Sequence, residues 1–434
     1  MDGGGESTFR PARPFPHVER RHSRDKPIMT MLSPLMLALV AMFLQQSFSI
    51  LAQGVIPLVA PAALPDLGVP PSYVGVFVGI YSVAKIFVSV GCGNVIRRYG
   101  GIRVSQAGQL LTFAGLAAAA SGQVWPFAAT AILLALGTGA GTPASSHILA
   151  AYAPPKLAPL IFSVKQTAVP IGLACGGVLV PFLVGWVGWQ GALLIFAILC
   201  ALFAFVLQPL RNAFDADRVP DQSLGLSDLG KSLILVWRNK GLRLLGFTMF
   251  AFVGLQVTYM TYLVLFLTES LGFTLTEAGG LFGAAMAASI PTRILWGIVA
   301  GTRVGSFNVL AGIGFGMAVA ALLTSLYAPG WTYWQLFAVA ALMTSTALGW
   351  QGVLLSEIAR LSPPGMVGPA TGGVLAFSSV GQVILPLTFS AILQMTGGYN
   401  LGFSIIAGPA LAAGVALFVH GLNAGRSPPQ AGQA

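Results

Sequence analysis

Charged residues are scarce in this sequence: Asp, Glu, Lys and Arg make up 8% of its 434 residues, against about 25% in an ordinary soluble domain. Hydrophobic residues make up 56%, and the mean hydropathy is +0.82. A soluble fold of this size cannot remove so much apolar surface from water. The composition therefore excludes a soluble enzyme, a soluble nucleic-acid-binding protein and a disordered chain, and it indicates an integral membrane protein.

Cysteine is also scarce. The three cysteines, Cys92, Cys175 and Cys200, all lie inside apolar stretches. An odd count with no cysteine in a polar loop gives no disulfide framework, and the spacings do not match those of metal ligands. We therefore interpret them as small buried hydrophobic residues, and we expect neither a metal site nor a cofactor.

Signatures of membrane-embedded enzymes are missing as well. The sequence holds no H-E-x-x-H, no G-x-S-x-G and no pair of acids inside an apolar stretch, the kinds of constellation that catalysis would need. Gly225–Ser232 matches the phosphate-binding pattern G-x-x-x-x-G-K-S letter for letter. That loop must follow a strand and precede a helix, and no apolar strand precedes Gly225. We predict no nucleotide site here, but a short inner helix capped by Ser227.

Long apolar stretches are what the sequence does contain. A helix needs about 20 residues to cross a bilayer, and we identify twelve such stretches: 32–62, 72–96, 104–122, 126–151, 158–185, 188–209, 243–268, 276–300, 305–327, 332–359, 366–394 and 400–422. They are continuous rather than alternating, which favours helices over the strands of a β-barrel. The sequence therefore predicts an all-α membrane protein with twelve transmembrane helices.

The charges that remain predict the orientation in the membrane. Residues 1–28 are rich in Arg, Pro and His and lack an apolar core with a cleavage site, so we interpret them as a disordered basic cytoplasmic tail rather than a secretion signal. With both termini inside, all but three of the 22 basic residues fall on the inner side, and the outer loops carry Asp66, Glu269 and Glu277. This follows the positive-inside rule and predicts a multi-pass protein of the plasma (bacterial inner) membrane.

An internal repeat divides the chain. The polar connection 210–242 separates 29–209 from 243–422, and 423–434 form a second cytoplasmic tail. The two parts share landmarks at offsets of 204 to 209 residues: Gly75 with Gly279, Gly93 with Gly297, Pro181 with Pro386, and Pro154-Pro155 with Pro363-Pro364. Duplicated halves are typical of secondary transporters. We therefore predict two pseudo-symmetric six-helix bundles.

Three segments carry a resemblance to a known family: Gly93-Asn94-Val95-Ile96-Arg97-Arg98-Tyr99-Gly100 after the second span, Ser163–Gly172 in the fifth and Arg293–Gly297 in the eighth. From about residue 30 to residue 422 the chain resembles the major facilitator superfamily, nearest to its bacterial cyanate-type and monocarboxylate-porter-like branch. The resemblance implies bundles that open alternately to either side, with the second, fifth, eighth and eleventh spans lining the seam between them.

The resemblance also implies a gating loop made of Gly93, Arg97, Arg98 and Gly100. The family pattern is G-x-x-x-D-R-x-G, and this sequence has Arg97 where the family has its acid. In the family that acid helps to lock one conformation of the gate. Whether this chain uses the same lock stays open at this point.

Three cations lie inside predicted spans, and all three fall on seam spans. They are Lys85, Lys165 and Arg293, and Glu357 is the only acid inside a span. A cation near mid-membrane costs about 2.5–3.5 kcal/mol on insertion scales, so it needs a counter-charge. We predict that an anionic solute supplies it, with Arg293 gripping a carboxylate through two hydrogen bonds. Structural pairing or snorkelling is the alternative for each cation.

Neutral polar residues complete the predicted site. We expect Gln256 and Tyr259 to hydrogen-bond the solute, with interhelical hydrogen bonding as the alternative. Of the other polar residues in the first, seventh, tenth and eleventh spans we expect some to face the solute as well: Gln45, Gln46, Gln53, Thr258, Tyr262, Trp350, Gln351, Ser378, Ser379 and Gln382. The sequence thus predicts a secondary active transporter for a small carboxylate-like anion, working by alternating access.

For coupling we expect protons, as in symport, with His147 and Glu357 as candidate carriers. An efflux transporter of the same superfamily for apolar or drug-like compounds is the alternative, in which the buried cations would be structural. We expect the lipid bilayer and a small solute as partners, and no nucleic acid.

Overall fold

The computed structural model describes residues 34–152, 161, 164–216, 218–221, 229–302, 304–363 and 367–426. Within these ranges all regular structure is helical, which confirms the all-α class. The helices are α1 (Pro34–Leu67), α2 (Tyr73–Tyr99), α3 (Gly101–Ala119), α4 (Val124–Gly139), α5 (Gly141–Tyr152), α7 (Ala168–Val206), α8 (Arg211–Phe214), α9 (Leu229–Arg238), α10 (Lys240–Glu269), α11 (Leu275–Ala300), α12 (Ser306–Thr324), α13 (Tyr333–Ala347), α14 (Gln351–Leu361), α15 (Val367–Thr396) and α16 (Tyr399–Arg426). The tail 1–28, Lys156 and residues 225–228 lie outside the described residues.

Nine helical segments in the described residues are long and apolar enough to cross a membrane, and a bent pair within α2 makes a tenth. The segment Val164–Phe214 counts as one of them although it is 51 residues long. It contains a kink at Gly188, whose φ of 72° and ψ of 170° are not helical. Glycine tolerates this backbone conformation because it has no Cβ. The kink lies between the predicted spans 158–185 and 188–209.

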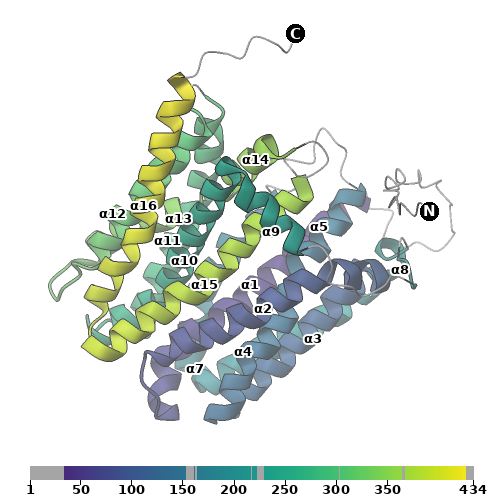
Figure 1. Cartoon of the computed structure of the whole chain (residues 1–434). Helices are drawn as coiled ribbons and strands as arrows, with labels where there is room; N and C mark the ends of the chain where they lie inside the picture. The colour runs from purple at the N-terminus through teal and green to yellow at the C-terminus, as the bar shows by residue number, and fades with distance from the viewer. Residues whose placement is uncertain are drawn as a thin grey trace, which may run out of the picture.

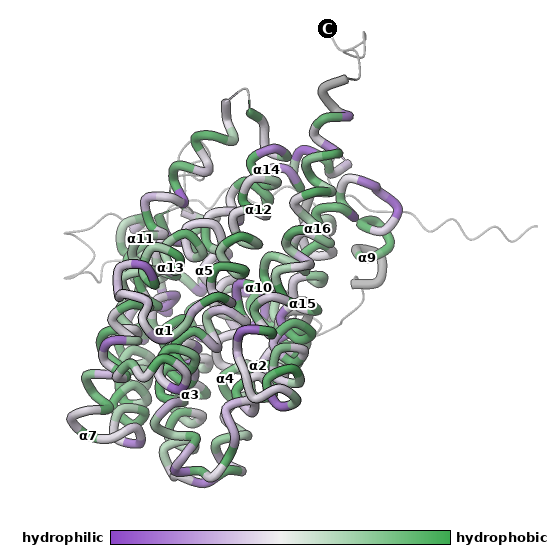
Figure 2. Tube along the Cα trace, turned by 90° about the vertical axis from the view of Figure 1, so that its left-hand side faces the viewer, coloured by the Kyte–Doolittle hydropathy of each residue, from purple (hydrophilic) through white to green (hydrophobic). Residues whose placement is uncertain are grey.

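Large apolar side chains cover the outer surface of the helices, as expected for contact with lipid. On α7 alone, Phe182, Trp186 and Phe205 are 65%, 74% and 70% exposed. Figure 2 shows hydrophobic residues along much of the length of the helices. A soluble monomer rarely exposes so much contiguous apolar area, so the surface fits a bilayer environment.

The two parts of the chain occupy different regions of the molecule. Helices α1–α8 group together and α10–α16 group together (Figure 1), with α1 against α7 in the first part and α10 against α15 in the second. Between the two parts, α2 contacts α15, α7 contacts α11 and α1 contacts α10. We call α2, α7, α11 and α15 the seam helices, since they make most of this boundary.

Glycines bring the seam helices together at one end. A side chain at Gly75 would meet the Tyr262 hydroxyl and, at 2.7 Å, the Pro386 carbonyl oxygen. A side chain at Gly279 would overlap the Pro181 ring and the Gly177 carbonyl. The sequence repeat thus appears as two crossed contacts, Gly75 with Pro386 and Gly279 with Pro181.

These contacts are confined to one end of the seam. The described glycines that closely approach the other part of the chain are Gly75, Gly79, Gly177, Gly279 and Gly283. Beside them, the Ser390 hydroxyl donates a 2.6 Å hydrogen bond to the Ser72 carbonyl oxygen. We call this region, defined by these residues, the closed end.

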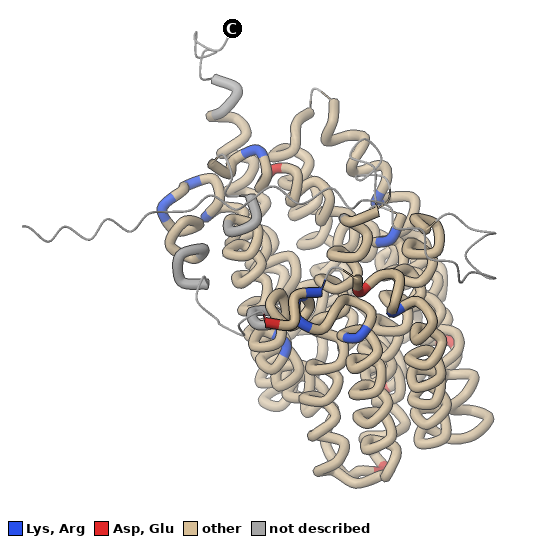
Figure 3. Tube along the Cα trace, turned by 90° about the vertical axis from the view of Figure 1, so that its right-hand side faces the viewer, with Lys and Arg blue, Asp and Glu red and all other residues tan. Residues whose placement is uncertain are grey.

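Charge separates along the same direction. Figure 3 shows the described Lys and Arg away from the closed end, which carries acidic positions instead. Asp66 lies at the end of α1, Glu269 ends α10 and Glu277 lies in the first turn of α11. Glu277 belongs to a capping box with Thr274, which satisfies backbone donors at the start of α11.

Candidate functional site

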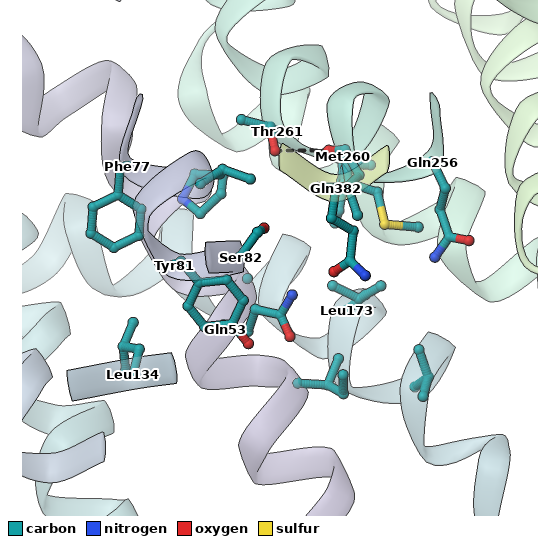
Figure 4. A pocket seen from close by; sticks show the side chains of 17 residues that line it. Gln53, Phe77, Tyr81, Ser82, Leu134, Leu173, Gln256, Met260, Thr261 and Gln382 are labelled. Atoms are coloured by element: carbon teal, nitrogen blue, oxygen red, sulfur yellow. Dashed lines mark hydrogen bonds between the residues drawn. The ribbon is translucent and has the colours of Figure 1, made fainter. Parts of the chain in front are cut away.

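A cavity lies between the two parts of the chain, next to the closed end (Figure 4). Residues of α1, α2, α7, α10, α11 and α15 line it, together with Leu134 of α4. Three aromatic side chains, Phe77, Tyr81 and Phe282, form part of its wall. An apolar cavity with a few polar groups is typical of a small-molecule site.

The side chains that line the cavity are all uncharged. The polar ones are Gln53, Gln256, Gln382, Tyr81, Ser82 and Thr261. Two hydroxyls already have partners: Tyr81 pairs with the Thr138 hydroxyl at 2.8 Å, and Thr261 donates to the Val257 carbonyl oxygen at 2.7 Å. By contrast, the Ser82 hydroxyl and the Gln256 side-chain oxygen are buried without a hydrogen-bond partner.

Lys85 contacts a residue of the cavity wall. Its ammonium nitrogen is 5.3 Å from the centre of the Tyr81 ring, and the ring itself lines the cavity. A cation over an aromatic face is attracted by about 0.5–2 kcal/mol. The contact supports the ammonium without neutralising it, so an anion can still bind beside it.

Lys165 is the most buried of the three predicted cations. Only 1% of its surface is exposed, and it lies one helical turn before Val169, which lines the cavity. Within the described residues, the structure pairs no acidic side chain with it. A buried ammonium without a carboxylate partner is costly, which is the condition that an anionic solute would relieve.

Arg293 binds neutral oxygens. Its guanidinium donates to the Gln166 carbonyl oxygen at 3.1 Å and to the Gln351 side-chain oxygen. It lies three turns along α11 from the cavity residue Phe282, roughly 16 Å at 1.5 Å per residue. Arg293 therefore lies across the seam from the Lys165–Gln166 segment, on the side of the cavity away from the closed end.

The other predicted site residues lie elsewhere. Tyr259 does not line the cavity: its ring packs edge-on against Phe403 of α16, with centroids 5.9 Å apart. His147 is half-buried on α5. Glu357 is buried on α14 and accepts a 2.7 Å hydrogen bond from the Arg360 guanidinium one turn away. Of Gln256 and Tyr259, the two residues predicted to hydrogen-bond the solute, the structure places Gln256 in the cavity wall, and Gln53 and Gln382 from the wider predicted set line it too.

Three residues of the predicted gating loop, Gly93, Arg97 and Arg98, lie in the last turns of α2, and Gly100 follows directly. This segment contacts the connection that follows α7. The Arg97 carbonyl oxygen accepts a 2.8 Å hydrogen bond from the Val219 backbone. The guanidinium of Arg98 lies over the neighbouring Tyr99 ring, 5.5 Å from its centre. Gly93 has open space around it. The loop thus has contacts with the connection between the bundles, but the acid of the family pattern is absent from it.

A different acid, Asp215, lies beside Gly100 and binds the start of α3. Its buried carboxylate accepts hydrogen bonds from the backbone amides of Ile102 at 2.8 Å and Arg103 at 3.0 Å. It therefore caps the first turn of α3, where a negative charge is favourable. Gly100 makes room for it, since its φ of 95° suits glycine and a side chain there would overlap Asp215. No pattern in the sequence indicates this contact, because only the fold brings Asp215 to α3.

Metal binding has no support in the described residues, which contain no group of three or more His, Cys, Asp or Glu side chains able to hold an ion. The cavity wall itself offers hydroxyls and carboxamides. These groups bind a solute by donating and accepting hydrogen bonds.

Comparison with known sequences gives a family and several relatives. A model of the Major Facilitator Superfamily matches residues 35–359. A 4-hydroxybenzoate transporter of Pseudomonas aeruginosa is 31% identical over 150 residues, which is 34% of this chain and 34% of that relative. A nitrite extrusion protein of Bacillus subtilis is 25% identical over 243 residues, 56% of this chain and 58% of that protein. The chain thus matches about a third to somewhat over half of these relatives.

Solved structures share the fold over nearly the whole chain. A POT family transporter in complex with 5-aminolevulinic acid superimposes with a TM-score of 0.74 at 12% identity, over 89% of this chain and 96% of that one. A nucleoside transporter gives a TM-score of 0.71 at 14% identity, over 88% and 99%. At such low identities the likeness concerns the fold alone.

Proposed function

Because this chain belongs to the Major Facilitator Superfamily, we propose that it is a secondary active transporter that moves a small carboxylate-like anion across the bacterial plasma membrane. The family and both sequence relatives are transporters, so the prediction of a transporter rather than an enzyme is confirmed. The observation that carries the choice of an anion is the set of seam cations. Lys85, Lys165 and Arg293 have no carboxylate partner among the described residues.

The proposal includes twelve spans, both termini in the cytoplasm, and two six-helix bundles at 29–209 and 243–422. The kink at Gly188 supports two spans within α7. The described Lys and Arg residues lie away from the closed end, which supports an outward position for that end, because Lys and Arg concentrate on the cytoplasmic side. The conformation of the described structure is then the one closed toward the outside, and the two bundles rock about the central cavity during transport.

The relatives support the choice of solute. One is named for 4-hydroxybenzoate and another for nitrite, both of which are anions at neutral pH. In this chain the aromatic wall of Phe77, Tyr81 and Phe282 would accommodate a ring, and Lys85, beside the Tyr81 ring, would attract a carboxylate. A small monocarboxylate with an apolar or aromatic body is the solute that fits both features.

Proton coupling is part of the proposal. Glu357 is held in an ion pair with Arg360, so His147 is the better candidate carrier of the two. Histidine is the side chain that ordinarily changes charge near neutral pH. No carboxylate of the described spans lies in the cavity wall, which leaves a protonated solute as the other carrier.

A second candidate function is efflux of apolar compounds. The uncharged, largely apolar cavity wall favours it. In that case the three cations would serve the structure, and binding would be indifferent to the charge of the solute. The two candidates therefore differ in a property that a binding experiment measures directly.

A thermal-shift panel on the detergent-purified full chain tests the proposal. The panel contains aromatic and aliphatic monocarboxylates, dicarboxylates, nitrate and cyanate, with neutral and cationic compounds of matched size as controls. A ligand at about 100 times its dissociation constant adds roughly 2.7 kcal/mol of apparent stability. We expect anions alone to raise the melting temperature. Stabilisation by neutral or cationic apolar compounds, without any by anions, would establish the efflux function instead.

A further inference from the structure

The short helix α9 carries an exposed apolar surface directly beside an exposed basic one. Ile234 and Trp237, one turn apart, are 55% and 62% exposed. Arg238 and Lys240, which follow them, are exposed as well. The other side of α9 is fixed to the protein, because Val236 is fully buried in the core and the helix packs against α15 and α10 (Figure 1). The mixed surface therefore belongs to a helix that the fold holds in place.

Contacts at the junction of α9 and α10 fix the position of the Trp237 ring. The Arg243 guanidinium lies 5.7 Å from the ring centre and donates a 3.4 Å hydrogen bond to the Trp237 carbonyl oxygen. Asn239 begins α10 by accepting hydrogen bonds from two of its first amides. Since α10 is a candidate membrane span that ends at Glu269, at the closed end, Trp237 lies at the opposite end of that span. Tryptophan is enriched at such positions, where lipid meets water.

The protein supplies no acid to balance the cations of this junction. Residues 229–268 contain no Asp or Glu, and α15 contains no charged residue. On α14, which contacts both α10 and α15, the one acid is Glu357, and it is already paired with Arg360. Among the residues that the structure describes, neither Arg238 nor Lys240 has an ion pair. The junction is therefore complementary to an anion from outside the protein.

The apolar part of the surface indicates which kind of anion this is. A soluble anion such as phosphate has no apolar part that could cover Ile234 and Trp237. An anionic phospholipid has both parts, a negative headgroup and acyl chains. An amphipathic helix with basic residues on one side and Trp on the other typically lies in the membrane interface, and Lys and Arg there are attracted to anionic lipids.

We propose that α9 forms a binding site for an anionic phospholipid, whose headgroup Arg238 and Lys240 bind and whose acyl chains cover Ile234 and Trp237. With both termini in the cytoplasm, the site lies in the cytoplasmic leaflet. The inference requires that the chain is embedded in a membrane, but it does not depend on which solute the chain carries. It therefore stands or fails independently of the proposed anion transport.

Quenching of tryptophan fluorescence by brominated lipids tests this on the full chain in vesicles. The chain has eight tryptophans, so the signal of Trp237 is the difference between the wild type and Trp237→Phe. The vesicles contain phosphatidylcholine with increasing fractions of either phosphatidylglycerol or phosphatidylcholine that is brominated on its acyl chains. We expect phosphatidylglycerol to associate at Trp237 about fivefold or more strongly than phosphatidylcholine.

Arg238→Gln/Lys240→Gln is expected to lower this preference to less than about twofold, with quenching by brominated phosphatidylcholine unchanged because the ring still lies in the bilayer. Arg211→Gln/Arg218→Gln is the matched control. It removes two other cations of the same connection between the bundles, and we expect it to keep the wild-type preference.

Equal quenching of Trp237 by the two brominated lipids in the wild type would overturn the inference. An undiminished preference in Arg238→Gln/Lys240→Gln, or an equal loss in the control, would overturn it too, because the preference would then not come from these two cations. Quenching of Trp237 by neither lipid would place α9 outside the bilayer and would also overturn it.

Discussion

Gly279→Leu is expected to abolish transport, whereas Gly280→Leu, at the next residue of the same helix, is expected to leave it near the wild-type rate. A side chain at Gly279 would overlap the Pro181 ring and the Gly177 carbonyl across the seam, but Gly280 has open space around it. Overpacking costs about 1–3 kcal/mol, which shifts an equilibrium between two conformations by roughly 5- to 150-fold. The bundles would then fail to meet at the closed end.

Accessibility of the cavity gives a second measurement of the same prediction. Ser82→Cys places a thiol in the cavity wall, in a Cys175→Ala background that removes the exposed native cysteine and leaves the buried Cys92 and Cys200. We expect Gly279→Leu to increase labelling of this thiol by a membrane-impermeant reagent added outside, and Gly280→Leu to leave it unchanged. Wild-type transport by Gly279→Leu, or equal loss in both variants, would show that the glycine contacts do not form the gate.

We assign Arg293 to a second position of the solute, on the side of the cavity away from the closed end and roughly 16 Å along α11 from Phe282. Arg293→Gln is expected to weaken binding of the anionic solute there by about 10- to 100-fold, since a hydrogen bond to a charged group contributes about 1.5–3 kcal/mol. Arg293→Lys should fall between this variant and the wild type. It keeps the positive charge but loses the planar geometry that grips a carboxylate through two bonds. The measurement is the concentration of solute that half-saturates uptake, compared for the three proteins.

A purely structural role of Arg293 predicts a loss of stability without a loss of affinity for the solute. The guanidinium joins Gln166 to Gln351 across the seam, so its loss would then lower the melting temperature while the half-saturating concentration stayed at the wild-type value. Arg243→Gln is a suitable control. This arginine lies in the same half of the chain, 5.7 Å from the centre of the Trp237 ring, and away from the cavity wall, so we expect its replacement to change neither quantity by much.

The sequence predicts the helical class, the repeat and the seam cations because each depends on a strong local signal. Apolar stretches define the spans, and a charged residue inside a span can be identified directly from the sequence. The pairs Gly75–Gly279 and Pro181–Pro386 indicate a repeat in the sequence. Only the fold shows that Gly75 contacts Pro386 and that Gly279 contacts Pro181.

The cavity wall is harder to predict, for a physical reason. A transmembrane helix is apolar on all sides, so hydrophobic periodicity does not show which side faces a cavity. Gln256 was predicted at the site, whereas Tyr81, Ser82 and Phe77 gave no signal that separates them from lipid-facing or interhelical residues. Tyr259, three residues after Gln256, lies against α16 instead. The contact of Asp215 with Ile102 joins residues 113 positions apart, and no sequence pattern indicates it.

Counterflow into proteoliposomes measures whether the chain exchanges an aromatic carboxylate across a membrane. The full chain is reconstituted into vesicles preloaded with unlabelled 4-hydroxybenzoate, and radiolabelled 4-hydroxybenzoate is added outside at low concentration. Exchange through one site then concentrates the label inside, whatever the coupling ion is. The account predicts transient accumulation that excess outside 4-hydroxybenzoate or another aromatic carboxylate abolishes and the neutral 4-hydroxybenzamide does not. Absence of accumulation for every small anion tested, together with counterflow of a neutral apolar compound, would contradict it.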